Sequence, residues 1–234
     1  MTLYRDIADN LAAARLRIRK SAQDAGRDPG DVRLLAVSKT FSLEHVRAAA
    51  AAGQQDFGEN RVQEALQKIG GSTDLTIRWH LIGTLQSNKV RKAVPRFSAI
   101  HSVDSLTLLE AIEEAATEAG VTPELLVQVD LAGEATKHGA LPAVARAIVE
   151  AASGCRSARC VGLMTIPPYF EDPEQARPYF ARLRDLQSTL LTQGIEPARL
   201  RELSMGMSHD FEIAVQEGAT IVRLGTAIFG RRPA

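Results

Sequence analysis

Short apolar runs alternate with longer helix-like stretches along most of the chain. Eight of these runs lack the polar alternation of a half-exposed strand and are typical of strands buried on both faces. They cover residues 33–39, 55–59, 79–83, 99–103, 124–131, 159–166, 201–206 and 220–225. The stretches between them are amphipathic or alanine-rich, and several begin with Ser, Asn or Pro and end with Gly, as helices commonly do. The pattern therefore predicts eight strand–helix units.

Such units predict a fold of the α/β class, with an all-parallel sheet and helices outside it. Eight is also the number of strands that closes a (β/α)8 TIM-type barrel, so we expect residues 1–234 to form a single domain of this architecture. An open, doubly wound sheet is the alternative. It is less favoured, because no Gly-x-Gly-x-x-Gly follows the first predicted strand.

Residues 1–27 precede the first unit and are expected to form an extra N-terminal helix packed on the barrel. Their apolar residues recur at helical spacing. These residues are Ile7, Leu11, Ala14, Leu16 and Ile18. Charged residues are spread throughout the segment, which excludes a secretion signal or a membrane span there.

The composition is that of an ordinary globular protein, with 45% hydrophobic and 24% charged residues among 234. Lys and Arg together number 28, as do Asp and Glu, so the formal net charge is zero and no basic surface for nucleic acid is predicted. The two cysteines, Cys155 and Cys160, have no histidine at metal-ligand spacing. We therefore expect no metal site and two reduced thiols in a cytoplasmic protein.

Polar and glycine residues follow the predicted strands at the ends that a barrel gathers into its functional mouth. They are Lys39, Glu59, Asn60, Gly83, Asp104, Asp130, Thr165, residues 204–208, Gly225 and Thr226. Most of them, taken singly, are equally compatible with ordinary strand ends. Lys39 is different, because it belongs to the first strand at the point where that strand enters the cavity.

Lys39 has a chemical property that its position makes useful. A lysine at the end of a buried strand is costly to desolvate, and burial favours its neutral amine. A neutral amine attacks an aldehyde, which is what Schiff-base chemistry needs. The alternative is a lysine whose ammonium reaches water from the rim.

The last two units supply candidates for an anion site, since such barrels often hold phosphate with the loops after strands seven and eight. Ser208 is expected to be the N-cap of the helix after the seventh strand, and Gly225 and Thr226 form the turn into a short terminal helix. Small residues at helix N-termini leave backbone N–H groups for an anion. An aldehyde-reactive amine opposite a phosphate cradle fits a phosphorylated aldehyde, and pyridoxal 5′-phosphate (PLP) is the natural candidate.

Arg223 lies two residues before the second of these turns. Pointing inward, its guanidinium would face the pyridine nitrogen of PLP, discourage its protonation and weaken the ring as an electron sink. Pointing outward, it would be a structural ion-pair residue. We favour the inward orientation.

Several motifs resemble those of the pyridoxal phosphate homeostasis proteins. They are LLAVSKT, FGENRVQEA, WHLIGTLQSNK, HSVDS, GLMTIPP and LSMGMSHDFEIAVQEGATIVRLGTAIFG, in that order between Leu34 and Arg231. The resemblance implies a barrel similar to the N-terminal domain of alanine racemases, in which Lys39 forms a Schiff base with PLP. It implies further contacts from Ser208, Gly225 and Thr226 to the phosphate, from Arg223 to the pyridine nitrogen, from Asn60 near the cofactor, and from Met205 and Gly206 in the loop of Ser208.

The same resemblance implies a PLP-binding protein that is not an enzyme. Alanine racemases add a second domain, whose dimer partner supplies a catalytic tyrosine across the cofactor, and Tyr4, Tyr169 and Tyr179 lie in no matching motif. Racemisation needs an acid–base group on each face of the substrate carbanion, and Lys39 is the one that can be named. Members of the family are regarded as binders that keep PLP available yet sequestered, and delivery to apo-enzymes is an expectation.

Some alternatives stay open. Lys137 is a candidate secondary lysine for PLP, although a solvated loop lysine is the favoured account, and His80 is expected to be a packed, hydrogen-bonded histidine. The chain could also be a PLP-dependent racemase or decarboxylase with Lys39 as base, or a cofactor-free aldolase. The aldolase is less favoured, because barrel aldolases usually carry the lysine on a later strand. We expect a monomer without nucleic-acid or membrane partners.

Overall fold

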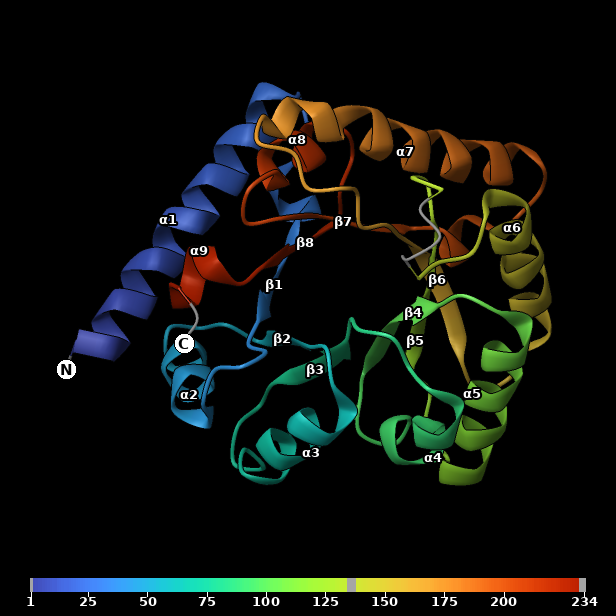
Figure 1. Ribbon diagram of the computed structural model, residues 1–234, viewed down its shortest axis with the longest axis horizontal. Helices are drawn as coiled ribbons and strands as arrows, with labels where there is room; N and C mark the ends of the chain where they lie inside the picture. The colour runs from blue at the N-terminus through green and yellow to red at the C-terminus, as the bar shows by residue number, and fades with distance from the viewer. Residues whose placement is uncertain (1, 134–137, 232–234) are drawn as a thin grey trace.

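The computed structural model describes residues 2–133 and 138–231 and contains a closed barrel of eight parallel strands in chain order (Figure 1). The strands are β1 (Arg33–Val37), β2 (Asp56–Glu59), β3 (Arg78–Leu81), β4 (Ala99–Val103), β5 (Glu124–Gln128), β6 (Arg159–Met164), β7 (Glu202–Met207) and β8 (Ile221–Leu224). Parallel pairing of β8 with β1 closes the sheet. The TIM-type barrel predicted from the sequence is confirmed, and the open sheet is excluded.

The predicted strands differ from the observed ones mainly at their C-terminal ends. The first predicted strand, 33–39, ends at Val37, and the fifth, 124–131, ends at Gln128. Ser38 and Lys39 follow β1 and Asp130 follows β5 outside the strands, at the mouth of the barrel, whereas Val129 still donates to Met164 O of β6. Lys39 therefore lies in a turn after β1 rather than in the strand itself.

Helices surround the barrel and cover its outer face (Figure 1). They are α1 (Thr2–Asp24), α2 (Leu43–Ala51), α3 (Val62–Gly70), α4 (Val90–Ala93), α5 (Leu106–Ala119), α6 (Pro142–Ala151), α7 (Arg177–Thr192), α8 (Phe211–Gln216) and α9 (Thr226–Phe229). Among the residues described, no helix combines the length and apolar character needed to cross a bilayer.

The extra N-terminal helix is α1, which packs against α2, α8 and α9. Asn10 Nδ2 donates a hydrogen bond to Ile228 O at 2.9 Å, and Ser21 Oγ donates to Glu212 O at 2.7 Å. These bonds connect the helix to both C-terminal helices. Of the apolar residues counted in the helical pattern, Leu16 lies off the buried stripe of α1 and is 62% exposed, whereas the other four are buried. That the whole chain behaves as one domain stays a prediction.

The barrel interior is partly polar. Apolar side chains inside it come from Leu35, Val37, Ile82, Leu126, Val161, Met164 and Ile221. The buried side chains of Arg223, Ser204, His101 and His80 share this interior and hydrogen-bond to one another. Buried polar groups are stable where such partners satisfy them. His80 is thus the packed, hydrogen-bonded histidine that was predicted.

Candidate functional site

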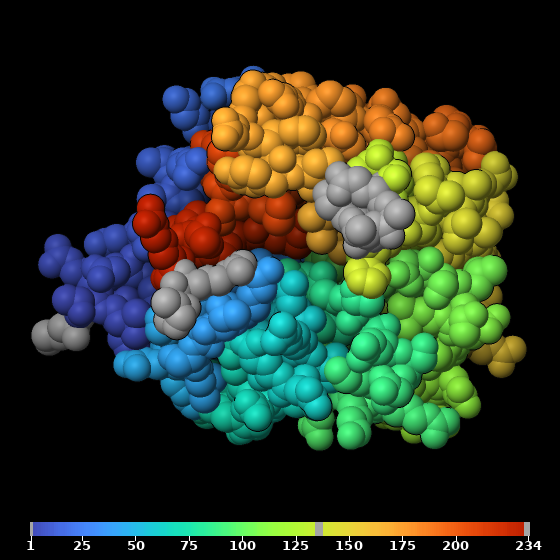
Figure 2. Space-filling model, viewed as in Figure 1, coloured from blue at the N-terminus to red at the C-terminus, as the bar shows by residue number. Residues whose placement is uncertain are grey.

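A cavity of about 370 Å³ opens at the C-terminal ends of the strands. It is lined by Val37, Lys39, Asn60, Ile82, Ile166, Tyr169, Met207, Ser208, His209, Arg223, Gly225 and Thr226. The surface of the C-terminal segment (red) borders the segments that follow β1 and β2 (blue to cyan) on this face of the molecule (Figure 2). Most of the residues predicted from the sequence are therefore brought together, with polar groups around a partly apolar wall, as in small-molecule sites.

Lys39 lies in a turn that is stabilised by a hydrogen bond to a neighbouring helix. It is partly buried, whereas Ser38 before it is fully buried. Thr40 after it has φ 69°, a left-handed conformation that is uncommon for a β-branched residue. The backbone N–H of Thr40 donates to Glu64 Oε1 at 2.6 Å, which stabilises this strained turn. The expectation of a buried lysine is corrected to one at the lip of the cavity.

A buried ion-pair cluster supports the same turn. Lys68 Nζ, from α3, donates to Glu59 Oε1 at 2.7 Å, to Glu64 Oε1 at 2.8 Å and to Ser38 O at 2.8 Å. Ser38 Oγ also donates to Glu59 Oε1, at 2.6 Å. Burial raises the pKa of Glu59, and hydrogen bonds from Lys68 and Ser38 oppose that effect. Lys68 was missed by the sequence analysis, because a helical lysine four residues after a glutamate is typical of a solvated pair.

Ser208 caps a different segment from the one predicted. Its Oγ accepts hydrogen bonds from Gly225 N at 3.1 Å and from Ala227 N at 3.2 Å, at the start of α9. The predicted capping of the helix after β7 is wrong: α8 begins at Phe211, and Asp210 Oδ1 accepts from Met207 N at 2.6 Å to close the intervening turn. The hydroxyl therefore reaches across from the β7 loop to the β8 loop. Both loops present their polar groups to one corner of the cavity.

Arg223 points into the barrel, as favoured from the sequence. Its Nη1 donates to Ser204 Oγ and its Nη2 to Thr165 O, both at 2.8 Å. Burial lowers the pKa of Arg223 to about 10, and the nearby Asp210 carboxylate acts in the opposite direction. The guanidinium therefore stays positively charged at neutral pH. The outward ion-pair role is excluded.

Asn60 provides a direct test of whether a polar ligand fits here. Its Oδ1 is buried and has no hydrogen-bond partner among the described residues, although Asn60 lines the cavity. A buried acceptor without a donor costs about 1–3 kcal/mol, so a ligand that donates to it gains that amount. The residues present thus fit a ligand with a phosphate, an aldehyde and a polar ring.

Two of the predicted residues do not line the cavity. The Met205 side chain is fully buried between the strands and the helices, not on the cavity wall. Gly206, near the end of β7, has φ 90°, and a Cβ there would meet the Cβ of Ala214 at 2.5 Å, so glycine is needed for the backbone conformation and for the packing of β7 against α8. A contact from either residue to a ligand stays a prediction, and their side chains do not supply it. Lys137 lies outside the described residues.

Two further residues at the mouth were missed. Tyr169 and His209 stack with ring centroids 5.4 Å apart and both line the cavity. His209 Nε2 lies 3.1 Å from the carbonyl oxygens of both Phe170 and Glu171, so this nitrogen carries a proton and donates. The loop containing Tyr169 follows β6 and comes close to the β7 loop only in the folded chain. Spacing in the sequence gave no signal for this pair.

Substitution of Gly83 by alanine is expected to displace the backbone of Asn60, which lines the cavity. A Cβ at Gly83 would lie 2.2 Å from Asn60 O, which cannot move away as a flexible side chain would. We expect Gly83→Ala to lower the free energy of unfolding by about 1–3 kcal/mol, the usual cost of overpacking, and to shift the Asn60 amide resonances. Denaturant unfolding and NMR measure the two effects. Gly70→Ala is the matched control, because nothing lies within 4 Å of a Cβ there, and equal effects in both variants would contradict the argument.

Comparisons with known proteins cover nearly the whole chain. The family description "Alanine racemase, N-terminal domain" matches residues 10–233. A pyridoxal phosphate homeostasis protein of Pseudomonas aeruginosa is 46% identical over 227 residues, which is 97% of this chain and 96% of the relative. Another, of Aquifex aeolicus, is 42% identical over 224 residues, 96% of this chain and 97% of the relative. The solved structure of PipY from Synechococcus elongatus with PLP bound has a TM-score of 0.85 at 44% identity, covering 96% of this chain and 100% of that one.

Proposed function

The chain belongs to the family of pyridoxal phosphate homeostasis proteins, and from that premise we propose that it binds PLP reversibly in the cavity and holds it in store rather than using it in catalysis. The observation that carries the proposal is the set of groups that line one cavity. An amine at Lys39, a cationic Arg223, and hydroxyl and backbone groups at Ser208, Gly225 and Thr226 share a space of about 370 Å³.

Each group has a role that its chemistry supports. PLP supplies an aldehyde that condenses reversibly with a lysine amine, forming a carbon–nitrogen double bond and releasing water. Lys39 at the lip provides the amine. Ser208 and Thr226 provide hydroxyls for the phosphate. The backbone N–H groups of Gly225 and Ala227 donate to Ser208 Oγ and hold that hydroxyl in place. Asn60 Oδ1, which is buried without a partner among the described residues, accepts a hydrogen bond from the ligand.

Arg223 supports storage over catalysis. Its guanidinium keeps its charge at neutral pH, because its pKa is lowered by burial only to about 10. A cation beside the pyridine nitrogen of PLP disfavours a proton on that nitrogen, and an unprotonated ring is a poor electron sink. A carboxylate at this position would have the opposite effect.

Racemisation is the second candidate function, because Tyr169 and His209 line the same cavity as Lys39. A two-base mechanism needs one of them on the opposite face of the substrate, ready to exchange a proton. His209 Nε2 is committed to the carbonyl oxygens of Phe170 and Glu171, and Tyr169 is 76% exposed. His209 Nε2 is therefore not free to exchange a proton with a substrate, and Tyr169 is not fixed against one. Little or no turnover is expected.

The wider cellular role extends the proposal. We infer that the chain is a cytoplasmic monomer that passes PLP to apo-enzymes and has no nucleic-acid or membrane partner. Free thiols at Cys155 and Cys160 are in keeping with a reducing compartment. A formal net charge of zero supports the absence of nucleic-acid binding.

One experiment tests storage against catalysis. The purified protein is incubated with PLP, reduced with borohydride, and analysed by intact mass and peptide mapping. One PLP per chain, attached to Lys39, is expected. A second sample is given a panel of amino acids, and then an apo-enzyme in the presence of a free-PLP trap. Transfer despite the trap supports direct delivery, whereas turnover at rates typical of PLP enzymes would overturn the storage role.

Removal of the Thr226 hydroxyl tests the phosphate cradle. Thr226→Val keeps the shape of the side chain and loses one hydrogen bond to a charged acceptor. We expect PLP affinity to fall by about 1–3 kcal/mol, with the free energy of unfolding of the cofactor-free protein nearly unchanged. Equilibrium titration measures the affinity. Thr76→Val, at an exposed position outside the cavity, is the matched control, and unchanged affinity in Thr226→Val would place the phosphate elsewhere.

A further inference from the structure

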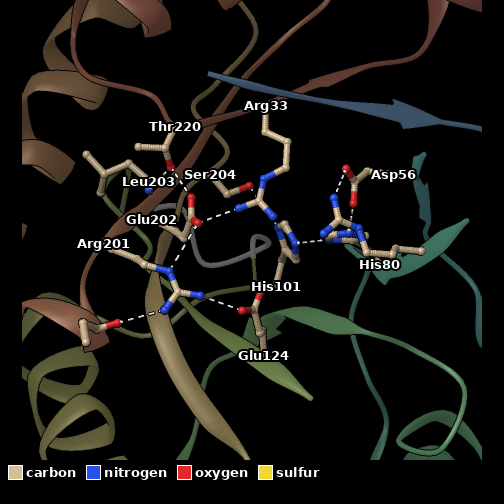
Figure 3. A network of polar contacts seen from close by, with 12 residues as sticks. Arg33, Asp56, His80, His101, Glu124, Arg201, Glu202, Leu203, Ser204 and Thr220 are labelled. Atoms are coloured by element: carbon tan, nitrogen blue, oxygen red, sulfur yellow. Dashed lines mark hydrogen bonds and ion pairs between the residues drawn. The ribbon is translucent and has the colours of Figure 1, made fainter. Parts of the chain in front are cut away.

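A series of hydrogen bonds, called here the hydrogen-bond chain, runs through the barrel interior. It leads from the cavity at the C-terminal ends of the strands to the opposite end of the barrel. Arg223 Nη1 donates to Ser204 Oγ at 2.8 Å, and Ser204 Oγ lies 3.0 Å from His101 Nδ1. His101 Nε2 lies 3.0 Å from His80 Nδ1, and His80 Nε2 lies 2.9 Å from Asp56 Oδ1. Figure 3 shows His80 between His101 and Asp56. The five residues come from β8, β7, β4, β3 and β2, and all are buried.

The two ends of this chain face different parts of the molecule. Arg223 lines the cavity at the C-terminal ends of the strands. Asp56 is the first residue of β2, at the N-terminal ends, and does not line that cavity. Its second oxygen accepts from Arg78 Nη2 at 2.7 Å, and the Arg78 side chain is half-exposed. The chain therefore connects the cavity with a charged pair at the far end of the barrel.

The carboxylate of Asp56 and the burial of His101 limit which ring nitrogens of the two histidines can carry a proton. Burial alone would raise the pKa of Asp56, but hydrogen bonds from His80 and Arg78 outweigh it and lower that pKa. The carboxylate therefore only accepts, and His80 Nε2 carries a proton. Burial, together with the positive charges around it, lowers the pKa of His101 well below 6.5, so this ring is neutral at pH 7.

The Ser204 hydroxyl selects between the two arrangements that remain. If His101 carries its proton on Nδ1, Ser204 Oγ accepts from both His101 and Arg223, and its own proton has no side-chain acceptor among the described residues. If His101 carries its proton on Nε2, Ser204 donates to His101, His101 donates to His80 and His80 donates to Asp56. Every group is then satisfied, which a fully buried site requires. All the donors point from Arg223 toward Asp56.

We propose that Ser204, His101 and His80 are positioning residues that fix the Arg223 guanidinium at the cofactor ring, and that the Asp56 charge at the far end sets the direction of the chain. This inference rests on the proposed function, because it takes Arg223 to face the pyridine nitrogen of PLP. The bonds to Ser204 and to Thr165 O use two N–H groups of Arg223 and orient its plane. Arg223 also lines the cavity, so its side chain borders the space that a ligand would occupy.

Loss of the Asp56 charge is expected to reverse the chain. An amide at this position can donate to His80 Nε2, after which His80 and His101 carry their protons on Nδ1. Ser204 Oγ then receives a hydrogen bond from His101 as well as from Arg223. The oxygen can accept both bonds, but the hydroxyl proton loses His101 Nδ1 as its acceptor. The hydroxyl must then turn to find another acceptor, which changes the direction of its bond with Arg223 and releases the guanidinium from its fixed orientation.

The first test uses the cofactor-free protein. Nitrogen-15 NMR of the histidine side chains is expected to show protons on Nε2 of His80 and His101 in the wild type, and on Nδ1 of both in Asp56→Asn. Glu202→Gln is the matched control, because Glu202 is a buried carboxylate that bonds to Arg33 and Thr220 rather than to the chain. Its tautomers should match the wild type. A proton on Nδ1 of His101 in the wild type, or no change in Asp56→Asn, would overturn the inference.

The second test uses bound PLP as a reporter. Asp56→Asn is expected to shift the absorption band of bound PLP and to change its dissociation constant about fivefold or more, the low end of couplings between distant sites. Glu202→Gln should change neither. Ser204→Ala, which breaks the chain at its junction with Arg223, should reproduce both effects and serves where Asp56→Asn does not fold. Wild-type-like PLP binding in the folded variants refutes the positioning role, whereas failure of the wild type to bind PLP refutes the proposed function and leaves the tautomer test in force.

Discussion

The Lys39→Ala variant is expected to lose the borohydride-stable PLP adduct completely while it keeps its folded structure. The adduct is lost because no amine remains at the lip of the cavity. The fold is kept because the turn is held by other groups: Ser38 is bonded to Glu59, and Thr40 N is bonded to Glu64. Intact mass after reduction measures the adduct, and denaturant unfolding measures stability.

Two further variants separate the chemistry of Lys39 from its charge. Lys39→Arg keeps a cation at the lip of the cavity that attracts the anionic ligand, but it cannot condense with an aldehyde. It should therefore bind PLP without a covalent adduct and more tightly than Lys39→Ala. Lys92→Ala removes an exposed lysine from α4 and should keep the full adduct. A stoichiometric adduct in Lys39→Ala, mapped to another lysine such as Lys137, would contradict the assignment. Global unfolding of Lys39→Ala would make Lys39 a structural residue.

The barrel could be predicted because its strands carry a strong signal. Strands of a parallel barrel are buried on both faces, so each appears as an apolar run, and the helices between them carry their own start and stop residues. The cavity residues Lys39, Asn60, Ser208 and Gly225 were found for a related reason. Each lies within two residues of the end of a strand, and the fold gathers those ends at one mouth.

Contacts between distant strands and helices could not be predicted in the same way. The approach of His80 to His101 depends on the register between β3 and β4, which apolar runs do not specify. Ser208 comes just before a helix in the sequence, but its hydroxyl accepts a hydrogen bond from Gly225, seventeen residues later. Lys68 sits four residues after Glu64 and has the spacing of a surface pair, yet it is buried against Glu59. In each case the tertiary structure supplies the partner.

Lys68→Met is expected to be the most destabilising of the substitutions described. The Lys68 side chain is 8% exposed and the Glu59 side chain is fully buried, so the variant leaves a carboxylate without its countercharge inside the protein. Breaking a buried pair by removing one partner typically costs about 3–5 kcal/mol. It also removes the bond to Ser38 O and one bond to Glu64, so the turn that carries Lys39 should loosen. Denaturant unfolding measures the cost.

A double variant and a pH series test whether the uncompensated carboxylate is the cause. Glu59→Gln/Lys68→Met removes both charges and should recover much of the lost stability, since a buried pair replaced as a whole is often nearly neutral. Burial raises the pKa of Glu59 in the folded protein, and Lys68 partly opposes this, so the pKa rises further in Lys68→Met. A protonated Glu59 then stabilises the folded variant at low pH, and this contribution is lost as pH rises through the raised value. The deficit of Lys68→Met should therefore shrink as pH is lowered from neutral toward 4.5. A deficit that is independent of pH, together with a double variant as unstable as the single one, would show that packing around the lysine stem, rather than its charge, holds the turn.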